Sequence, residues 1–194
     1  MSDSIAAKAA LRATMRARMR AVTEDECATL ISVAQKYASE HWSTSMTVAI
    51  YGGLRGEPDL VTHFLPWLTQ NGHRAALFAV ADEKLTPRLI RDAADYERGI
   101  LGAWEPAAHC PELAVGALDV IWVPGLAFSP KTGARLGRGG GYYDRLLADP
   151  GCRARKITLA HAFQLQEDVP AEAHDQRVEL ILTADACLTP HAHA

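Results

Sequence analysis

The residues with the clearest chemical potential lie in one glycine-rich segment, residues 124–144, which has the sequence PGLAFSPKTGARLGRGGGYYD. It follows an apolar run and leads into a helix-compatible stretch, a pattern that predicts strand, long loop and helix. Four glycines within residues 137–141 let backbone N–H groups approach a ligand closely, and the helix start adds positive dipole. Phosphate is the natural ligand of such a loop, with Arg135, Arg138 and Lys131 as nearby positive charge.

The glycine cluster alone does not identify a nucleotide site, because glycines also build ordinary flexible turns. The segment lacks the Gly-Lys-Ser/Thr of a Walker loop, and Gly137-x-Gly139-x-x-Tyr142 lacks the third glycine of a dinucleotide fingerprint. The loop is also longer than the tight turn that a dinucleotide fold uses after its first strand. These residues alone are compatible with two interpretations, a phosphate-binding loop and a flexible turn.

Two carboxylates stand where a site is expected. Asp144 falls in the first turn of the helix after the glycines, where the dipole favours a carboxylate whether or not it does chemistry. Glu57 follows a predicted strand at its carboxyl end, which is where open α/β sheets place their ligands. An acidic residue at a helix start is the other interpretation of Glu57.

Residues 5–21 predict a helix with two different faces. Lys8 and Arg12 are four residues apart, so both cations can reach one phosphate chain, although a solvated basic face explains the spacing equally well. A separate, apolar stripe consists of Leu11, Met15 and Met19. We expect this helix to be held by its apolar face and to use its cationic face for another purpose.

The remaining pattern predicts the scaffold. Thr23 and Glu26 form a capping box that opens a second helix. Short apolar runs predict strands, and helix-compatible stretches lie at about 58–70 and 142–149. The predicted strands are residues 47–51, 75–80, 119–123, 156–162 and 178–183. This alternation predicts an α/β fold with a mostly parallel central sheet covered by helices on both faces.

Two segments carry weaker signals. Residues 81–118 contain prolines and glycines that break up any long element, so only short pieces are expected there. Residues 188–194 are expected to be a flexible tail.

Composition limits the class of protein. With 194 residues, we expect residues 1–194 to form a single domain, in which residues 1–22 are an N-terminal basic helix. A net charge of -3 supplies no overall basic field for nucleic acid, and no apolar run is long enough for a membrane helix. The four cysteines include no Cys-x-x-Cys pair. We expect a cytoplasmic protein, with an organelle transit peptide as the alternative for the basic N-terminus.

A resemblance to a known family rests on the same residues. Pro-Gly-Leu-Ala-Phe followed by Arg-Leu-Gly-Arg-Gly-Gly-Gly-Tyr-Tyr-Asp resembles the signature of the 5-formyltetrahydrofolate cyclo-ligase family, also called methenyltetrahydrofolate synthetases. The further matches are spread over nearly the whole chain: Lys8-x-x-Leu11-Arg12, Glu57-x-Asp59, Glu105-Pro106, Phe163-Gln164-Leu165 and His174-Asp175.

The resemblance implies a fold like that of the NagB/RpiA/CoA transferase group and an ATP-dependent ligase with magnesium. It implies conversion of 5-formyltetrahydrofolate to 5,10-methenyltetrahydrofolate, in folate and one-carbon metabolism. The implied catalytic residues are Arg138 and Asp144, with Asp144 also the metal ligand. The implied ATP-binding residues are Lys8, Arg12, Arg135, Gly137, Arg138, Gly139, Gly140, Gly141 and Tyr142. The implied folate-binding residues are Tyr51, Glu57, Trp104 and Tyr143.

One departure and two alternatives accompany this hypothesis. Some family members carry a lysine where Gly140 stands, and Lys131 is a candidate replacement. A non-catalytic relative that binds nucleotide or folate is the alternative function. An RNA-binding relative is disfavoured by the acidic balance of charge. We expect a monomer that acts on small molecules, with no nucleic-acid or membrane partner.

Overall fold

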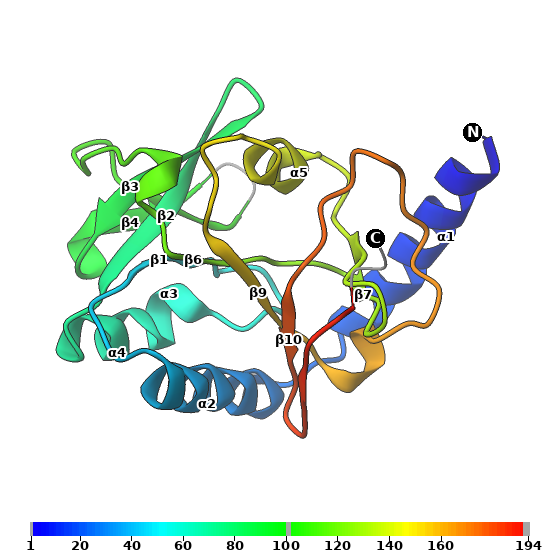
Figure 1. Ribbon diagram of the computed structural model, residues 1–194, viewed down its shortest axis with the longest axis horizontal. Coiled ribbons are helices and arrows are strands. Elements are labelled where there is room, and N and C mark those ends of the chain that lie inside the picture. Colours follow the sequence, from blue (N-terminus) through cyan, green and yellow to red (C-terminus); the bar gives the residue numbers. More distant parts are fainter. Residues whose placement is uncertain (1, 100–101, 192–194) are drawn as a thin grey trace.

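The computed structural model describes residues 2–99 and 102–191 as an α/β fold (Figure 1). The helices are α1 (Ser2–Met19), α2 (Glu24–His41), α3 (Leu60–His63), α4 (Leu65–Gln70) and α5 (Tyr142–Leu147). The strands of the central sheet are β1 (Thr47–Ala49), β2 (Arg74–Ala81), β3 (Lys84–Ile90), β6 (Val120–Trp122), β9 (Arg155–Leu159), β10 (Leu180–Leu182) and β11 (Cys187–Leu188). Two small hairpins pair β4 (Tyr96–Arg98) with β5 (Trp104–Pro106), and β7 (Ala127–Phe128) with β8 (Arg135–Leu136).

The seven strands of the central sheet have the order β11-β10-β9-β6-β1-β2-β3. The neighbours from β10 through to β2 are parallel, whereas β3 and β11 run antiparallel at the two edges. The mostly parallel sheet predicted from the sequence is therefore confirmed. All five predicted strands are present, with bounds that differ by a few residues.

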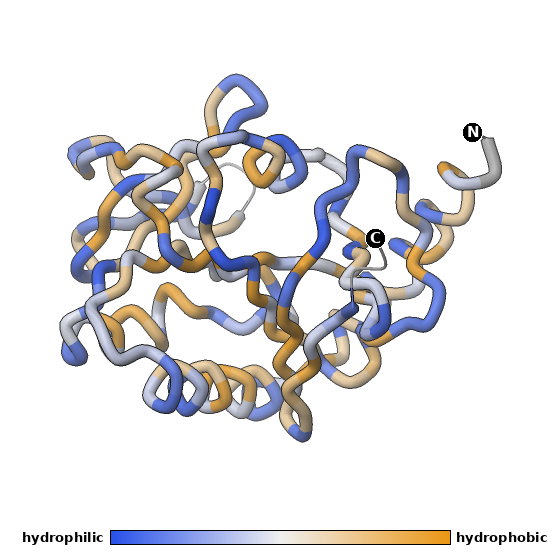
Figure 2. The backbone as a smooth tube through the Cα atoms, viewed as in Figure 1, coloured by the Kyte–Doolittle hydropathy of each residue, from blue (hydrophilic) through white to orange (hydrophobic). Residues whose placement is uncertain are grey.

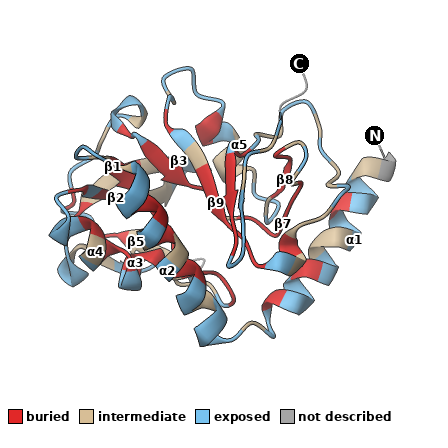
Figure 3. Ribbon diagram, turned by 60° about the horizontal axis from the view of Figure 1, so that its bottom comes forward, coloured by how far each residue is buried: buried red, intermediate tan, exposed pale blue. Residues whose placement is uncertain are grey.

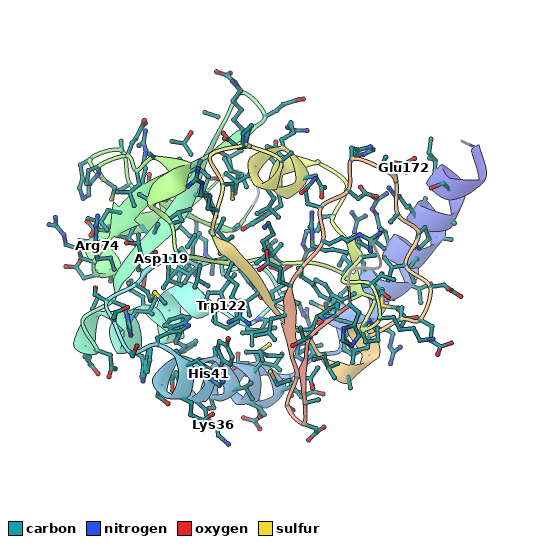
Figure 4. The ribbon with its side chains drawn as sticks, in the orientation of Figure 1. Lys36, His41, Arg74, Asp119, Trp122 and Glu172 are labelled. Atoms are coloured by element: carbon teal, nitrogen blue, oxygen red, sulfur yellow. The ribbon has the colours of Figure 1, made fainter. Side chains whose placement is uncertain are left out.

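Helices cover both faces of the sheet, as predicted. On one face, buried residues of α2, α3 and α4 pack against sheet residues such as Val48 and Trp122 (Figures 1 and 3). On the other face, Leu146 and Leu147 of α5 pack with Ile121. Alternate residues of one strand thus point to opposite layers. The central strands are among the most hydrophobic parts of the chain (Figure 2), and Trp122 lies on the α2 side of the sheet (Figure 4).

Helix α1 lies beyond the end of the sheet and packs on the β7–β8 hairpin. Met15 and Met19 are 2% and 3% exposed and contact a cluster that includes Leu136. The predicted apolar stripe is therefore the face by which α1 is held, and the cationic face is left for other contacts. The predicted capping box at Thr23 and Glu26 is also present, at the start of α2.

The segment 81–118, for which we expected only short pieces, contains one full strand of the sheet. Strand β3 pairs with residues 75–81 of β2, and Pro87 lies opposite Phe78. Proline is tolerated because β3 is an edge strand. The outer side of β3 is covered by residues 111–113, since Leu89 N–H donates to the Pro111 carbonyl and Leu113 N–H donates to the Pro87 carbonyl.

The C-terminal end corrects the predicted start of the tail. Leu188 pairs with Ile181 in β11, and His191 N–H donates to the Lys131 carbonyl. Residues 192–194 of the expected tail lie outside the described residues. Across residues 2–99 and 102–191, no helix has both the length and the apolar character needed to cross a membrane.

Candidate active site

Two adjoining cavities lie beside the glycine loop, which we define as residues 137–141. The larger has a volume of about 480 Å³ and the smaller about 220 Å³. They share four lining residues: Arg135, Gly137, Gly141 and Asp144. A ligand in one cavity would therefore lie next to a ligand in the other.

The larger cavity is mainly apolar, and its walls come from several strands and loops. Tyr51 follows β1, Phe78 belongs to β2, Trp104 begins β5, and Tyr143 belongs to α5. The Phe78 and Tyr143 rings meet edge to face, with centroids 5.8 Å apart. Burial raises the pKa of the Tyr143 hydroxyl well above its usual value, so this hydroxyl stays protonated. A flat aromatic ligand fits such a surface.

Glu57 is a buried polar residue of this cavity and is 7% exposed. Arg138 donates to Glu57 Oε1 from Nε at 2.9 Å and from Nη2 at 2.6 Å. Burial raises the pKa of Glu57, and the Arg138 guanidinium opposes that rise. The pair joins the loop after β1 to the glycine loop, two segments that are far apart in the sequence.

Trp104 is fixed by a hydrogen bond at the edge of its ring and by a guanidinium over its face. Its indole Nε1–H donates to Asp59 Oδ2 at 2.8 Å. The Arg98 guanidinium lies 3.7 Å from the ring centroid and donates to the carbonyls of Gly53 and Gly102. These bonds tie the β4–β5 hairpin to the loop after β1, so that the hairpin forms one wall of the larger cavity.

The wall shared by the two cavities contains a buried ion pair. Arg135 is 5% exposed, and its Nη2 donates to Asp144 Oδ1 at 2.7 Å. The same carboxylate oxygen accepts from Gln176 N–H at 3.1 Å. Among the described residues, the other carboxylate oxygen of Asp144 has no hydrogen-bond partner. Asp144 therefore keeps one oxygen available at the boundary between the cavities.

The smaller cavity is polar and is lined by charged residues of α1 and of the segment before β10. Lys8 Nζ donates to Asp175 Oδ2 at 2.6 Å and to Glu172 Oε2 at 2.9 Å. Burial would lower the pKa of Lys8, but the bonds to Asp175 and Glu172 outweigh it and raise the pKa, so Lys8 is charged. Glu172 lies on the loop next to α1 in Figure 4. Arg12 lines the same cavity, and its Nε donates to the Gly137 carbonyl at 3.0 Å.

The structure brings every sequence-predicted site residue to these two cavities. Tyr51, Glu57, Trp104, Arg138, Gly140, Tyr142 and Tyr143 line the larger cavity, Lys8, Arg12 and Gly139 line the smaller, and the four shared residues line both. Lys131, the candidate replacement for a lysine at position 140, lines neither cavity. Its side chain is 69% exposed and pairs with Glu167.

Sequence reasoning assigned no role to several residues that hold the site together. Asp59 and Asp175 lie within matched motifs, but the motifs do not show that they bind Trp104 and Lys8. Glu172, the other partner of Lys8, lies in no motif. Because these pairs join segments that are distant along the chain, spacing carries no signal for them.

Comparisons with known proteins identify relatives of the chain. The model of the 5-formyltetrahydrofolate cyclo-ligase family matches residues 4–184. A 5-formyltetrahydrofolate cyclo-ligase of Mycolicibacterium smegmatis is 34% identical over 143 residues, which covers 71% of this chain and 73% of the relative. A mouse protein of the same name is 26% identical over 194 residues, which covers 93% and 95% of the two chains.

Two solved structures are also similar. The NMR structure of Aquifex aeolicus 5,10-methenyltetrahydrofolate synthetase has a TM-score of 0.80 at 28% identity, covering 94% of this chain and 92% of that one. The 5,10-methenyltetrahydrofolate synthetase of Mycoplasma pneumoniae shares the fold, with a TM-score of 0.69 at 24% identity over 90% and 96% of the two chains. This chain belongs to the 5-formyltetrahydrofolate cyclo-ligase family.

Proposed function

We propose that this chain converts 5-formyltetrahydrofolate to 5,10-methenyltetrahydrofolate, with ATP converted to ADP and phosphate. The observation that carries the proposal is the pair of adjoining cavities of different chemistry. The apolar cavity suits a pterin ring, and the polar cavity beside the glycine loop suits a phosphate chain. The shared wall allows the two substrates to meet.

The larger cavity would hold the folate. Glu57 is the buried acceptor for the N–H groups of the pterin, because a carboxylate inside an apolar cavity accepts strongly from such donors. Tyr51, Trp104 and Tyr143 supply the surface against which the ring stacks. Trp104 is held in place by Asp59 and Arg98, so this surface is formed before the ligand binds.

The smaller cavity and the glycine loop would hold ATP. Lys8 and Arg12 reach this cavity from α1, and Arg135 and Arg138 reach the site from β8 and the loop. Tyr142 and the backbone N–H groups of Gly137, Gly139, Gly140 and Gly141 complete the proposed phosphate contacts. Each cation is engaged with a carboxylate or a carbonyl before ligand binds, so binding must exchange these contacts.

Magnesium fits the residues present. Asp144 offers one carboxylate oxygen without a protein partner, and Mg²⁺ is bound in many ATP sites by one or two carboxylates together with phosphate oxygens. Asp175 lines the same cavity, and Gln176 next to it is bonded to Asp144. We propose Asp144 as the ligand, with the ion supplying neutralisation of phosphate charge when bound.

The reaction follows from the meeting of the two substrates. The formyl oxygen attacks the γ-phosphorus of ATP, a new P–O bond forms, and ADP leaves. N10 then attacks the formyl carbon, the C–O bond breaks, and phosphate leaves with the oxygen while N10 loses its proton. The protein aligns the substrates and holds charge on the transferring group, which is the role proposed for Arg138.

The four cysteines are free thiols, which fits the reducing cytoplasm that we propose as the location. We also propose that the chain acts as a monomer on small-molecule substrates, since both cavities are built from one chain.

The test is absorbance in the methenyl-folate band when purified protein meets 5-formyltetrahydrofolate, magnesium and ATP. An increase that requires ATP would establish the reaction. If folded protein that binds ATP gives no increase, the proposal is wrong and the chain is a non-catalytic relative that binds nucleotide or folate.

A further inference from the structure

Three arginines bind backbone carbonyls of the glycine loop. Besides the bond from Arg12 to Gly137, Arg16 Nη2 donates to the Arg138 carbonyl at 2.8 Å. Arg145 Nη2 donates to the Gly140 carbonyl at 2.9 Å. Arg16 and Arg145 line neither cavity. Arg12 makes the same kind of bond but also lines the smaller cavity, so Arg16 and Arg145 differ from it in holding the loop from outside both cavities.

A carbonyl held in this way fixes the direction of the next N–H group. The peptide unit is planar and trans, so the C=O of one residue and the N–H of the next point in opposite directions. Arg16 holds the Arg138 carbonyl and therefore directs the Gly139 N–H away from itself. Arg145 acts on the Gly141 N–H in the same way, through the Gly140 carbonyl. Within the described part of the chain, neither N–H has an acceptor.

The backbone of the loop fits this arrangement. Gly139 and Gly141 have φ of +111° and +68°, whereas Arg138 and Gly140 do not have positive φ. Successive residues of alternating handedness bring N–H groups to one concave side, where an anion can bind. A Cβ at position 141 would lie 2.7 Å from Arg145 Nη1, so a side chain there would displace the Arg145 guanidinium from its present position.

Arg145 connects the loop to a second anchor. Its Nε and Nη2 donate to the Glu83 carbonyl at 3.0 and 2.7 Å. Glu83 and Asp82 form the hydrophilic turn between β2 and β3, which lies next to α5 in Figures 1 and 2. Both residues have positive φ, so this turn has a defined backbone conformation. Arg145 thus ties the loop to a sheet hairpin.

Arg16 provides the anchor on the opposite side. It follows Met15, whose buried side chain holds α1 against the β7–β8 hairpin. The loop is therefore held between two separate anchors. One is α1, through Arg16, and the other is the β2–β3 turn, through Arg145.

We propose that Arg16 and Arg145 are positioning residues for phosphate binding, which orient the Gly139 and Gly141 N–H groups through the carbonyls that precede them. This inference rests on the proposed ATP site. Loss of either arginine leaves the substrates' own contacts in place but lets the peptide unit rotate. The KM for ATP should then rise about tenfold, the effect expected for losing a charged hydrogen bond, with KM for the folate unchanged.

The decisive experiment is an NMR spectrum of ligand-free protein labelled with ¹⁵N-glycine, which gives at most 14 backbone signals. Arg16→Met should shift the Gly139 signal and leave Gly141 in place, and Arg145→Met should do the reverse. The matched controls are Arg20→Met, at the end of α1, and Arg153→Met, after α5. Both arginines are exposed, and within the described part of the chain neither side chain makes a hydrogen bond or an ion pair.

The kinetic arm uses the same variants. Arg16→Lys and Arg145→Lys retain a donor and should recover part of the KM for ATP. If the Met variants raise KM for ATP without moving Gly139 or Gly141, the arginines contact phosphate themselves and the inference is wrong. Unchanged KM, or shifts spread over all glycines, would overturn it as well. Absence of turnover in the unsubstituted chain would refute the proposed function. The NMR spectra of the ligand-free variants would still show whether Arg16 and Arg145 orient the Gly139 and Gly141 N–H groups.

Discussion

At the scale of single residues, the site is built from cations that already have partners. Arg138 is paired with Glu57, Arg135 with Asp144, and Lys8 with two carboxylates. An ion pair that is largely buried leaves a costly unpaired charge when one member is removed. Substitution of one member of a pair therefore affects the other member. Each variant at this site should be compared with a variant in which the partner is substituted as well.

The first prediction concerns Arg138→Ala. Removing a donor that stabilises transferring charge should lower kcat by roughly two to three orders of magnitude, measured by methenyl-folate absorbance at saturating substrates. The same change leaves Glu57 buried and unpaired, so the variant should also be less stable. A double variant with Glu57→Gln removes that unpaired charge. If the double variant recovers stability while its kcat stays well below that of Glu57→Gln alone, the rate effect belongs to Arg138 itself; near-normal turnover of Arg138→Ala would exclude the proposed role.

The second prediction is a pH dependence of folate binding. Burial raises the pKa of Glu57 above 4.5, with Arg138 opposing the rise. If the carboxylate accepts from the pterin, binding should weaken as pH falls through the raised pKa. For stability the sign is opposite: the contribution of Glu57 is present below 4.5 and is lost as pH rises through the raised pKa.

Fluorescence titration of the folate between about pH 5 and pH 8 measures this effect, since the pKa of Glu57 is raised from its ordinary value. Glu57→Gln serves as the reference protein. The folate itself titrates in the same way with both proteins, but the variant lacks the carboxylate at position 57. Parallel pH profiles for the two proteins would show that Glu57 is not the group that titrates.

At the scale of elements, the hydrophobic pattern was sufficient to predict the parallel strands and the first two helices. Strand β3 was missed because Pro87 interrupts its pattern, and proline is acceptable there only because of its position at the sheet edge. Edge position is a property of the folded sheet. The β4–β5 hairpin fits the expectation of short pieces in this segment, but the sequence did not place its strands, since Trp104 is fixed by contacts with Asp59 and Arg98 rather than by its neighbours in sequence.

The third prediction concerns the capping box of α2. Thr23 Oγ1 accepts from Glu26 N–H, and Glu26 accepts from Thr23 N–H. Thr23→Ala should lower the free energy of unfolding by about 1 kcal/mol, measured by urea denaturation, with kcat unchanged. Thr29→Ala, on the exposed face of the same helix, is the control and should change stability by about 0.5 kcal/mol or less. Equal decreases in the free energy of unfolding of both variants would mean that the capping box does not stabilise the protein more than an exposed threonine within the helix.

At the scale of the whole molecule, the Arg138–Glu57 pair lies in the larger cavity and joins the loop after β1 to the glycine loop, and we expect it to couple the binding of the two substrates. The sequence could indicate the residues of each cavity, because they lie in motifs, but not this coupling, because the partners are 81 residues apart. If the pterin engages Glu57 as proposed, Arg138 should become freer to bind phosphate. Binding of either substrate should then favour the other.

The fourth prediction follows from this coupling. A non-hydrolysable ATP analogue should tighten folate binding by about tenfold, and the folate should tighten binding of the analogue by the same factor. Calorimetric titrations in both orders measure the two factors. In Glu57→Gln the coupling should disappear. Independent binding in the unsubstituted protein would show that the ion pair does not link the cavities.

The two edges of the central sheet bear on how the molecule behaves at high concentration. An open edge strand is a template for pairing with another chain, and such pairing leads to aggregation. Here β3 carries Pro87 and is overlaid by residues 111–113, and β11 has two residues and is followed by Pro190. Within the described chain, neither edge offers a long free ladder. Copies of this protein should therefore resist edge-to-edge pairing of their sheets even at high concentration.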